Sequence, residues 1–450
     1  MDKKLLPFAL QDVPRYTSYP TAVQFQDGFS EDLADRWLTE LRPTASLSVY
    51  VHVPFCQQLC WYCGCHTSVP NSYGRASAYV DSLIRDISRS GALSGGRKCN
   101  VRHLHFGGGT PTYLSNRDLG RILACINGSF DLAPDAEIAL ESDPRGITRD
   151  RAFGLAALGF NRISFGVQDF ALPVQMKINR LQTYGLVTHV TALLREAGFI
   201  SINFDLMYGL PAQTVGSVRQ TAKQAAALRP NRISVFGYAH VPWFKKHQRM
   251  ISDMELPGVS ERYEQATAIA EELAGAGYIA IGLDHFALPD DGLAVAASAG
   301  TLRRNFQGYT TDTADALIAF GASAISEFPQ GFAQAARDTL AWSKAIAEEK
   351  SPVARGLATT AEDRMGAAII EQIMCNFAAD FGQIAGQHGF NDAIVEDSLL
   401  RLQPLVEAGL ASIDGSTVRV RQEHRLFLRS VACAFDSHYT DARNRHAKAI

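Results

Sequence analysis

The chain has 450 residues, of which 46% are apolar and 20% charged, and its formal net charge is −3. This composition is typical of a soluble enzyme with one large α/β domain and a smaller one, and it argues against nucleic-acid or anionic-membrane binding. No apolar run reaches the length of a membrane span, and the opening MDKKLLPFALQDVP is not a signal peptide. We therefore expect a cytoplasmic protein without membrane insertion.

Residues 1–46 form a polar arm before the first predicted strand. The segment PRYTSYP at 14–20 contains aromatic residues and an arginine, which favours a docked arm over a disordered one. A helical pattern follows near Ser30–Leu41.

The stretch Tyr50–His66, YVHVPFCQQLCWYCGCH, holds four of the eight cysteines directly after a strand pattern. Cys56, Cys60 and Cys63 lack the second cysteine pair that structural zinc sites use. Three thiolates fit three corners of a [4Fe–4S] cluster and leave one iron open to an exogenous ligand such as S-adenosylmethionine (SAM). Cys65 would strain to reach the same cluster. The alternative is a group of unrelated buried or redox thiols.

Strand-like and helix-like segments alternate from Leu47 to about Ala287. Helices of this length between strands require parallel crossovers, and Ile- and Val-rich strands suit a sheet that helices cover. The predicted strands are Leu47–Val53, Val101–Phe106, Ile138–Ser142, Arg162–Gly166, Ser201–Met207, Arg232–Tyr238 and Tyr278–Leu283. The predicted helices include Ala76–Arg89, Arg117–Ile126, Gly185–Ala197, Ser217–Leu228 and Glu261–Ala274.

Several polar or glycine-rich motifs follow these strands, where parallel sheets place their sites. The glycines of Gly107–Thr110 would expose backbone amides to a ligand carboxylate, although a plain turn is the commoner structure for such a motif. His103 and His105 alternate on a strand, but no third ligand of matching spacing supports a metal site. Asp284 and His285 could orient substrate or move a proton, or form a structural pair.

The pattern changes from about Ser351 to amphipathic helices at Thr360–Phe377 and Asn391–Ala408, followed by a hairpin-like segment at Leu410–Val420. These elements suggest a winged-helix-like domain. Without a basic face, a substrate lid or packing module is favoured over DNA binding. We divide the chain into an arm (1–46), a catalytic barrel with its active-site loops (47–350) and a mostly helical domain (351–450).

The cysteine stretch resembles the radical SAM signature, and its extended form with Cys65 resembles the oxygen-independent coproporphyrinogen III oxidase family. The resemblance covers nearly the whole chain. Its further segments are PRYTSYPTA, HFGGGTPTYLS, ESDPR, FNRISFGVQDF, FDLMYGLPAQT, SVFGYAHVP, GLDHFALPDD and RNFQGYTT. It implies an α/β fold with an incomplete (β/α)6 radical SAM barrel and chemistry at the C-terminal strand ends.

The resemblance also implies a reaction. Two propionates of coproporphyrinogen III would be oxidatively decarboxylated to vinyl groups without oxygen, which gives protoporphyrinogen IX in heme biosynthesis. A [4Fe–4S] cluster would cleave SAM to a 5′-deoxyadenosyl radical that takes a hydrogen from the propionate β-carbon. Two SAM molecules, a low-potential electron donor such as a flavodoxin or ferredoxin, and a monomeric enzyme are further expectations.

Site residues follow from the family motifs. Cys56, Cys60 and Cys63 would hold the cluster, Cys65 would support catalysis, and Tyr50 would act catalytically and contact the first SAM. Also expected at the first SAM are Gly108, Gly109, Glu141 and Ile325. Expected at the second SAM are Tyr62, Gly109, Thr110, Gln168, Arg180, Asp205 and Ala239. Phe306 and Gln307 would line the active site, and Arg15 is expected at the substrate carboxylates.

Two departures and two rival functions accompany this assignment. The family usually has Phe where Tyr62 stands, and an acidic residue where Leu181 stands in NRLQT. A heme-binding chaperone of the same superfamily would lack the cysteine at Cys65 and the PRYTSYPTA arm. A radical SAM heme-degrading methyltransferase is disfavoured by YGLPAQT, GYAHVP and RNFQGYTT.

Overall fold

The computed structural model describes residues 2–42, 44–94, 99–440 and 448–450. Positions 1 and 43 of the expected arm, and 441–447 of the expected C-terminal domain, lie outside the described residues. Within the described part of the chain, no helix has both the length and the apolar composition that a membrane span requires.

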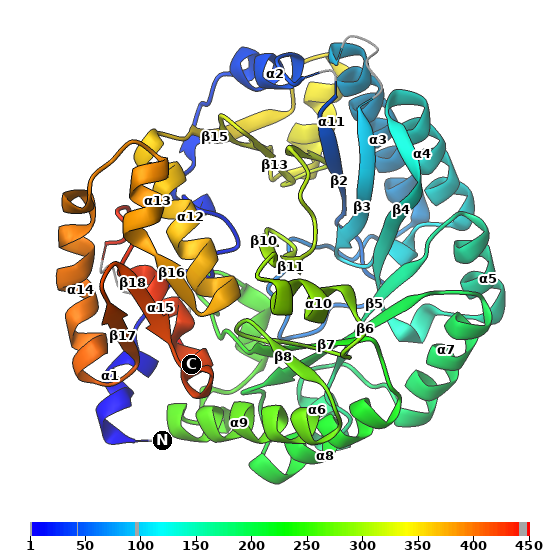
Figure 1. The fold of residues 1–450 in the computed structure, drawn as a ribbon. Coiled ribbons are helices and arrows are strands. Elements are labelled where there is room, and N and C mark those ends of the chain that lie inside the picture. Colours follow the sequence, from blue (N-terminus) through cyan, green and yellow to red (C-terminus); the bar gives the residue numbers. More distant parts are fainter. Residues whose placement is uncertain (1, 43, 95–98, 441–447) are drawn as a thin grey trace.

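A 13-stranded sheet forms the centre of the fold, and its middle strands are parallel (Figure 1). Strands β2 to β7 pair in chain order, and β12 pairs in parallel with the free edge of β2. The bounds are β2 Ser46–Val53, β3 Asn100–Gly108, β4 Asp131–Ser142, β5 Arg162–Gln168, β6 Ser201–Tyr208, β7 Arg232–Gly237 and β12 Ala316–Phe320. The mixed α/β fold with a parallel core, predicted from the alternating pattern, is confirmed.

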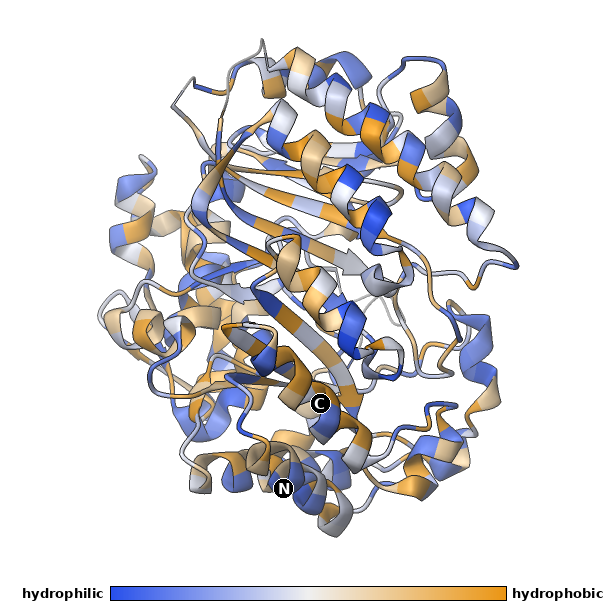
Figure 2. Ribbon diagram, turned by 90° about the vertical axis from the view of Figure 1, so that its right-hand side faces the viewer, coloured by the Kyte–Doolittle hydropathy of each residue, from blue (hydrophilic) through white to orange (hydrophobic). Residues whose placement is uncertain are grey.

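Helices join the successive parallel strands and lie along the outer side of the curved sheet (Figure 1). Figure 2 shows hydrophilic and hydrophobic residues mixed along these helices, as expected when one face of a helix meets solvent. Side-chain caps set the starts of α4, α5, α7 and α8, for example Ser115 before α4 and Thr214 before α8. The bounds are α3 Tyr73–Leu93, α4 Asn116–Ser129, α5 Arg149–Ala157, α6 Leu172–Lys177, α7 Tyr184–Glu196, α8 Val215–Ala227 and α9 Val259–Gly275.

The last predicted strand, Tyr278–Leu283, does not become a parallel neighbour of β7, and that expectation was wrong. The chain forms β8 (Ile279–Ile281), turns at Gly282 with φ +50°, and returns as β9 (His285–Ala287). Strand β9 pairs antiparallel with both β7 and β8, so it separates them. The glycine permits this turn, because a positive φ is costly for residues with a Cβ.

Antiparallel strands extend the other edge of the sheet beyond β12. They are β13 Ile325–Phe328, β14 Gly331–Ala335, β15 Val353–Ala358 and β1 Gln26–Asp27. The large sheet therefore takes up a strand of the arm and continues past position 350. Between the two edges lie α10 Gly292–Ala299 and the hairpin β10 Arg303–Asn305 and β11 Gly308–Thr310. Helix α11 Thr339–Ala347 packs against α3 instead.

The C-terminal elements form a separate core beside the open side of the sheet (Figure 1). They are α12 Ala361–Asn376, β16 Ala378–Asp380, α13 Phe381–Gln387, α14 Glu396–Glu407, β17 Ala411–Asp414, β18 Thr417–Val420 and α15 Leu428–Cys433. Leu5, Ala9 and Tyr19 of the arm pack into this core, whereas Trp37 of α2 (Glu31–Thr39) packs into the core of the large sheet. The arm thus connects the two cores.

Trp342 of α11 is fully buried, and its ring centroid lies 4.6 Å from that of Tyr79. We expect Trp342→Ala to lower the free energy of unfolding by about 3–5 kcal/mol, because it leaves a large cavity. Leu340→Ala on the same helix is the control, since Leu340 is 74% exposed and its loss should change stability little. Urea unfolding measures both variants, and equal stabilities would contradict the packing described.

Candidate active site

The three predicted cluster ligands lie in the loop after β2, at the C-terminal edge of the parallel strands. The Sγ atom of Cys56 lies 3.1 Å from the hydroxyl of Thr67. Arg180 Nη1 donates to Sγ of Cys60 at 3.5 Å. Cys60 is buried, while Cys56 and Cys63 are partly exposed. A hydroxyl group therefore contacts Cys56, and a guanidinium group contacts Cys60. Burial raises the pKa of Cys56, and the hydrogen bonds with Thr110 and Thr67 oppose that rise.

No three His, Cys, Asp or Glu side chains in the described part of the chain are grouped closely enough to hold one metal ion. The arrangement thus does not provide a mononuclear site such as zinc. In a [4Fe–4S] cluster each iron takes one thiolate, so the ligands need not converge on one point. The donor set of Cys56, Cys60 and Cys63 fits such a cluster.

Cys65 differs from Cys63 in its ionisation. A hydrogen bond from the Cys65 thiol, opposed by burial, lowers the pKa of Cys63 to about 7. The same bond, together with burial, raises the pKa of Cys65. Cys63 therefore ionises first, and Cys65 keeps its proton as the donor. Because the thiolate is the form that binds metal, this supports Cys63 as a ligand.

Hydrogen bonds within the protein occupy the amides of the glycine motif (Gly107–Thr110), and one of them ties the motif to Phe55 at the start of the cysteine loop (54–66). The backbone amides of the last three residues, Gly108, Gly109 and Thr110, already donate to acceptors inside the protein. The donors and acceptors are Gly108 N–H to Glu141 Oε2 (3.1 Å), Gly109 N–H to Val53 O (2.9 Å) and Thr110 N–H to Phe55 O (2.8 Å). The expectation of amides free for a carboxylate was therefore wrong. The cofactor roles of Gly108, Gly109 and Thr110 stay predictions that depend on their other groups.

Tyr50 and Glu141 meet above Gly107. A Cβ atom at Gly107 would lie 3.0 Å from both the Tyr50 hydroxyl and Oε1 of Glu141. Burial lowers the pKa of His52 to about 4, so this imidazole is neutral. Its Nε2–H donates to His66 O at 3.1 Å, which leaves Nδ1 to accept from the Tyr50 hydroxyl at 3.1 Å. The hydroxyl of Tyr50 is thereby fixed beside the Glu141 carboxylate.

The predicted histidine pair is split between two acidic partners. His105 Nε2 lies 3.6 Å from Oε1 of Glu141, and its ring stacks on Tyr50. His103 Nε2 lies 3.8 Å from Oδ1 of Asp312. The two rings thus serve separate contacts.

Gln168, Arg180 and Asp205 come together around Gly166, as predicted for one binding pocket. A Cβ atom at Gly166 would lie 2.5 Å from Nε2 of Gln168 and 3.1 Å from Nη2 of Arg180. Asp205 is the partner of Gly166 in the β5–β6 register. Gln168 has φ +65°, which is unusual for a residue with a Cβ and marks a position held by its surroundings.

Arg180 is held in this position by Asp143, an acidic residue that was not among the predicted site residues. Its Nη1 pairs with Oδ2 of Asp143 at 3.1 Å, and Nε donates to Gly166 O at 3.1 Å. Arg145 contacts the same carboxylate, with Nη2 2.6 Å from Oδ2. Leu181, at the departure from the family pattern, is 57% exposed and points away from the core. The fold thus holds Arg180 without an acidic residue at 181.

Tyr62 and Ala239 are joined by a buried amide. Gln248 Nε2 donates to Tyr62 O at 2.9 Å and to Ala239 O at 3.3 Å. This links the cysteine loop to the segment after β7. Ala239 also lines a cavity together with Gln307 and Arg15. The structure therefore places Ala239 in the cavity wall and connects Tyr62 to it through Gln248, although Tyr62 itself is not among the lining residues.

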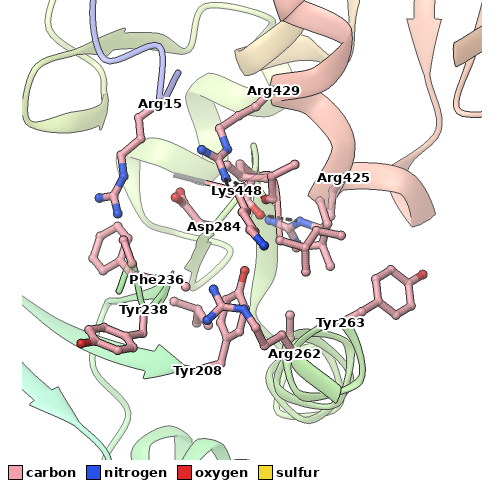
Figure 3. A pocket seen from close by; sticks show the side chains of 18 of the residues that line it. Arg15, Tyr208, Phe236, Tyr238, Arg262, Tyr263, Asp284, Arg425, Arg429 and Lys448 are labelled. Carbon is pink, nitrogen blue, oxygen red and sulfur yellow. Dashed lines mark hydrogen bonds between the residues drawn. The ribbon is translucent and has the colours of Figure 1, made fainter. Parts of the chain in front are cut away.

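The cavity has a volume of about 990 Å³ and lies beyond the ends of β6 and β7. Phe306 lines it as well, whereas Ile325, at the start of β13, is not among the described residues that line it. In Figure 3, Arg15, Arg425 and Arg429 surround it on one side and Tyr208 and Arg262 on the other. The arm, the sheet, α9 and the C-terminal elements all contribute to its wall.

Five arginines of this wall form no salt bridge with a carboxylate among the described residues. They are Arg15, which is exposed, and Arg262, Arg304, Arg425 and Arg429. Nε of Arg262, Nη1 of Arg304 and Nε of Arg429 are buried without a hydrogen-bond partner in the described structure. Burial lowers the pKa of Arg262, and it lowers the pKa of Arg429 to about 10. Buried cations that lack anions indicate a site for an anionic ligand.

Asp284 is a carboxylate of the cavity wall whose ionisation two of these cations favour. Burial opposes its ionisation, but a hydrogen bond from His285 and the charges of Arg304 and Arg425 lower the pKa of Asp284 to about 2. Asp284 Oδ1 lies 2.7 Å from Nδ1 of His285, so the predicted polar pair exists and faces the cavity. This hydrogen bond orients His285, whose backbone belongs to β9.

Of the cavity arginines, the sequence indicated only Arg15, and it also did not point to His52 or Asp143. One signal was present, because Arg425 and Arg429 stand four residues apart in the apolar run RLFLRSV. That spacing puts both side chains on one face of a helix. The glycines around Arg262 gave no signal, since Gly209 and Gly237 meet it only after folding.

The model of the Radical SAM superfamily matches residues 50–225 of the chain. This match covers the cysteine loop and the strands that carry Glu141, Gln168 and Asp205. The protein is thus of the radical SAM class.

More specific similarity covers almost the whole chain. It is 47% identical to the oxygen-independent coproporphyrinogen III oxidase of Bradyrhizobium diazoefficiens over 97% of both chains. It is 40% identical to that of Escherichia coli K12 over 94% of this chain and 93% of the relative. A solved Escherichia coli coproporphyrinogen III oxidase, described as a radical SAM enzyme, superposes with a TM-score of 0.90 at 39% identity, covering 96% of this chain and 100% of that one. The chain belongs to the oxygen-independent coproporphyrinogen III oxidase family, which confirms the resemblance.

A substitution at Gly109 tests the close contact between the glycine motif and the cysteine loop. A Cβ atom there would lie 2.6 Å from Oγ1 of Thr67 and 2.7 Å from Phe55 O. We expect Gly109→Ala to displace the loop and reduce the iron bound after anaerobic reconstitution by about half or more. Gly74→Ala, whose nearest neighbour would be 3.7 Å away, is the control. Equal iron content in both variants would contradict the conclusion that the packing of Gly109 positions the cysteine loop.

Asp205 should make stability depend on pH. Burial and the Glu141 carboxylate raise its pKa to about 7, above the roughly 4 of an unfolded chain. The folded protein then keeps a proton that the unfolded chain releases, so this stabilisation is lost as pH rises through about 7. Asp205→Asn should gain stability over the wild type, on the order of 1–3 kcal/mol, as the pH rises from about 4 to about 7. Denaturant titrations of the cofactor-free proteins at several pH values measure the difference in the free energy of unfolding between the variant and the wild type. A difference that does not change with pH would contradict the raised pKa of Asp205.

Proposed function

We propose that the protein converts coproporphyrinogen III to protoporphyrinogen IX without oxygen, by oxidative decarboxylation of two propionates. The observation that carries this proposal is the arginine-lined cavity at the same sheet edge as the three-thiol loop. A substrate with several carboxylates provides the anions that the buried arginines lack. The names of the relatives, which are similar over nearly their full lengths, support the same reaction.

Cys56, Cys60 and Cys63 would hold a [4Fe–4S] cluster. When bound, the cluster supplies the electron that cleaves SAM reductively. Tyr50, Glu141, Gly108 and Ile325 are proposed at the first SAM. Gln168, Arg180, Asp205, Tyr62, Gly109, Thr110 and Ala239 are proposed at a second SAM.

The chain's own residues position these groups. Asp143 fixes Arg180, and neutral His52 fixes the Tyr50 hydroxyl, so neither side chain needs to reorganise when a ligand binds. Cys65 keeps a proton next to Cys63 and is proposed to support catalysis. Gln307, in the turn between β10 and β11, would cover the reacting propionate.

Arg262 is the arginine best placed to meet a substrate carboxylate. Gly209 and Gly237 leave space for its guanidinium, which lies over the Tyr208 ring at 5.6 Å. Arg15 and Arg429 lie across the cavity (Figure 3). Cations on opposite walls suit a tetrapyrrole whose propionates project from its rim. We therefore assign Arg262 and Arg429 to different propionates.

The finer architecture belongs to the same proposal. The strands β2 to β7 with their helices correspond to an incomplete (β/α)6 radical SAM barrel. The C-terminal helices with the β16–β18 sheet correspond to a winged-helix-like module that closes the cavity as a substrate lid. The proposal also includes a monomer, a flavodoxin or ferredoxin as low-potential electron donor, and action in the cytoplasm.

Removing the charge of Arg262 should weaken substrate binding. We expect Arg262→Met to raise the Kd for coproporphyrin III by about 10- to 100-fold, because a charge-assisted hydrogen bond contributes about 1.5–3 kcal/mol. Arg149→Met is the control, since Arg149 is exposed and pairs with Glu196 on the surface. Fluorescence titration measures binding, with the tetramethyl ester as an uncharged ligand that the substitution should not affect. An unchanged Kd for the free acid would contradict the assignment.

The reaction itself is tested anaerobically. The enzyme is reconstituted with iron and sulfide and given SAM, dithionite, an electron acceptor and coproporphyrinogen III. We expect protoporphyrin after oxidation, together with 5′-deoxyadenosine, and loss of both with Cys60→Ser. SAM cleavage with unchanged coproporphyrin would contradict the proposed reaction, and tight heme binding in that sample would favour a chaperone.

A further inference from the structure

The segment after β7 exposes large apolar side chains close to the cysteine loop. We define the 244–254 face as Phe244, Lys246, Arg249, Met250 and Met254. The three apolar members are 68%, 61% and 96% exposed, in the order Phe244, Met250 and Met254. Exposed apolar side chains gathered in one short segment indicate an interaction site, because burying them against a partner is favourable.

This segment is fastened to the cysteine loop by side chains that alternate with the exposed ones. His247 donates from Nε2 to Cys63 O at 2.7 Å. Lys245 Nζ donates to Cys65 O at 2.9 Å, and Gln248 Nε2 donates to Tyr62 O at 2.9 Å. A protein bound to the 244–254 face would therefore lie close to Cys63, a proposed cluster ligand, because His247 of the same segment contacts the Cys63 backbone.

The face is positively charged. Lys246 and Arg249 form no ion pair among the described residues, and no acidic residue occurs from 243 to 250. The nearest acidic residues in sequence are engaged elsewhere. Asp253 Oδ1 lies 2.7 Å from Nε2 of His240, and Glu255 Oε1 lies 2.5 Å from Nζ of Lys177. Charge complementarity therefore favours an acidic partner.

We propose that the 244–254 face docks an acidic, flavin-bearing one-electron carrier protein that reduces the cluster. The proposal rests on the proposed function, because only a redox centre behind Cys63 gives this surface a purpose. The anionic reduced flavin loses one electron and becomes neutral, and the cluster gains that electron, with no proton moved. The aromatic ring of Phe244 and the thioethers of Met250 and Met254 suit the planar apolar edge of a flavin. An iron–sulfur carrier offers no such ring.

Trp243 stays outside this face because it also lines the substrate cavity. None of Phe244, Lys246, Arg249 and Met250 lines that cavity in the described structure. Substitutions on the 244–254 face can therefore separate partner binding from substrate binding.

The test compares two double variants of the reconstituted enzyme. Lys246→Glu with Arg249→Glu reverses the charge of the face. Lys344→Glu with Arg421→Glu is the matched control, because these residues are 76% and 79% exposed at their side chains and lie on α11 and after β18. Calorimetry measures the Kd for a purified acidic flavodoxin at low and high salt, with a purified ferredoxin as the second probe.

We expect the face variant to raise the Kd for flavodoxin by about tenfold or more at low salt and to lose most of its salt dependence. The control should bind as the wild type does, and Phe244→Ser should also weaken binding at high salt. Iron content and dithionite-driven turnover should stay at wild-type levels in all variants.

Three results would overturn the proposal. They are an unchanged Kd in the face variant, tighter binding of ferredoxin than of flavodoxin at the same face, and an equal loss of dithionite-driven turnover. If the wild type makes no protoporphyrinogen with dithionite, the proposed function fails, whereas the flavodoxin Kd still decides whether the face docks its partner.

Discussion

Two buried arginines hold the separate parts of the chain around one cavity. Arg425 donates from Nη2 to Gly282 O at 2.7 Å, which joins the C-terminal elements to the turn between β8 and β9. Arg429 donates to Val13 O at 3.2 Å and to Ala449 O at 2.7 Å, which joins the arm and the end of the described chain. Carbonyl oxygens solvate these cations but do not neutralise them. Burial therefore keeps a free-energy cost that an anionic ligand would remove.

The same edge of the sheet places the chemistry beside this cavity. Parallel strands β2 to β7 all end there, so the cysteine loop, Glu141 and Gln168 come from successive strands. Gln248, which is fully buried, connects the cysteine loop to the cavity wall at Ala239. A ligand held by the arginines thus lies on the side of the sheet where the proposed cofactors bind, which a reaction at the rim of a large substrate requires.

Local patterns were enough to predict the parallel core. Apolar runs of strand length, separated by amphipathic helices, predicted strands β2 to β7 and their parallel connections, and the cysteine spacing pointed to an iron–sulfur centre. The insertion of β9 was not predictable from these patterns, because the run at 278–283 looks like any other buried strand. Its place depends on the turn at Gly282 and on pairing with β7 across the fold.

The details of the site depend on contacts that a sequence does not contain. The glycine motif was correctly placed at the strand end, but its amides donate to Glu141, to the last residue of β2 and to Phe55, because β2 and β3 end side by side. Arg180 was found by its motif, whereas its partner Asp143 is evident only in three dimensions. Arg262 sits on an ordinary amphipathic helix, and only the close approach of Gly209 and Gly237 shows that its charge faces a cavity.

The most direct test of this account is a crystal structure of the anaerobically reconstituted enzyme with SAM and coproporphyrinogen III bound. We expect a cluster bound by Cys56, Cys60 and Cys63, and a tetrapyrrole in the cavity with different propionates bound to Arg262 and Arg429. A tetrapyrrole bound outside this cavity, or one whose propionates leave both arginines without an anion, would contradict it.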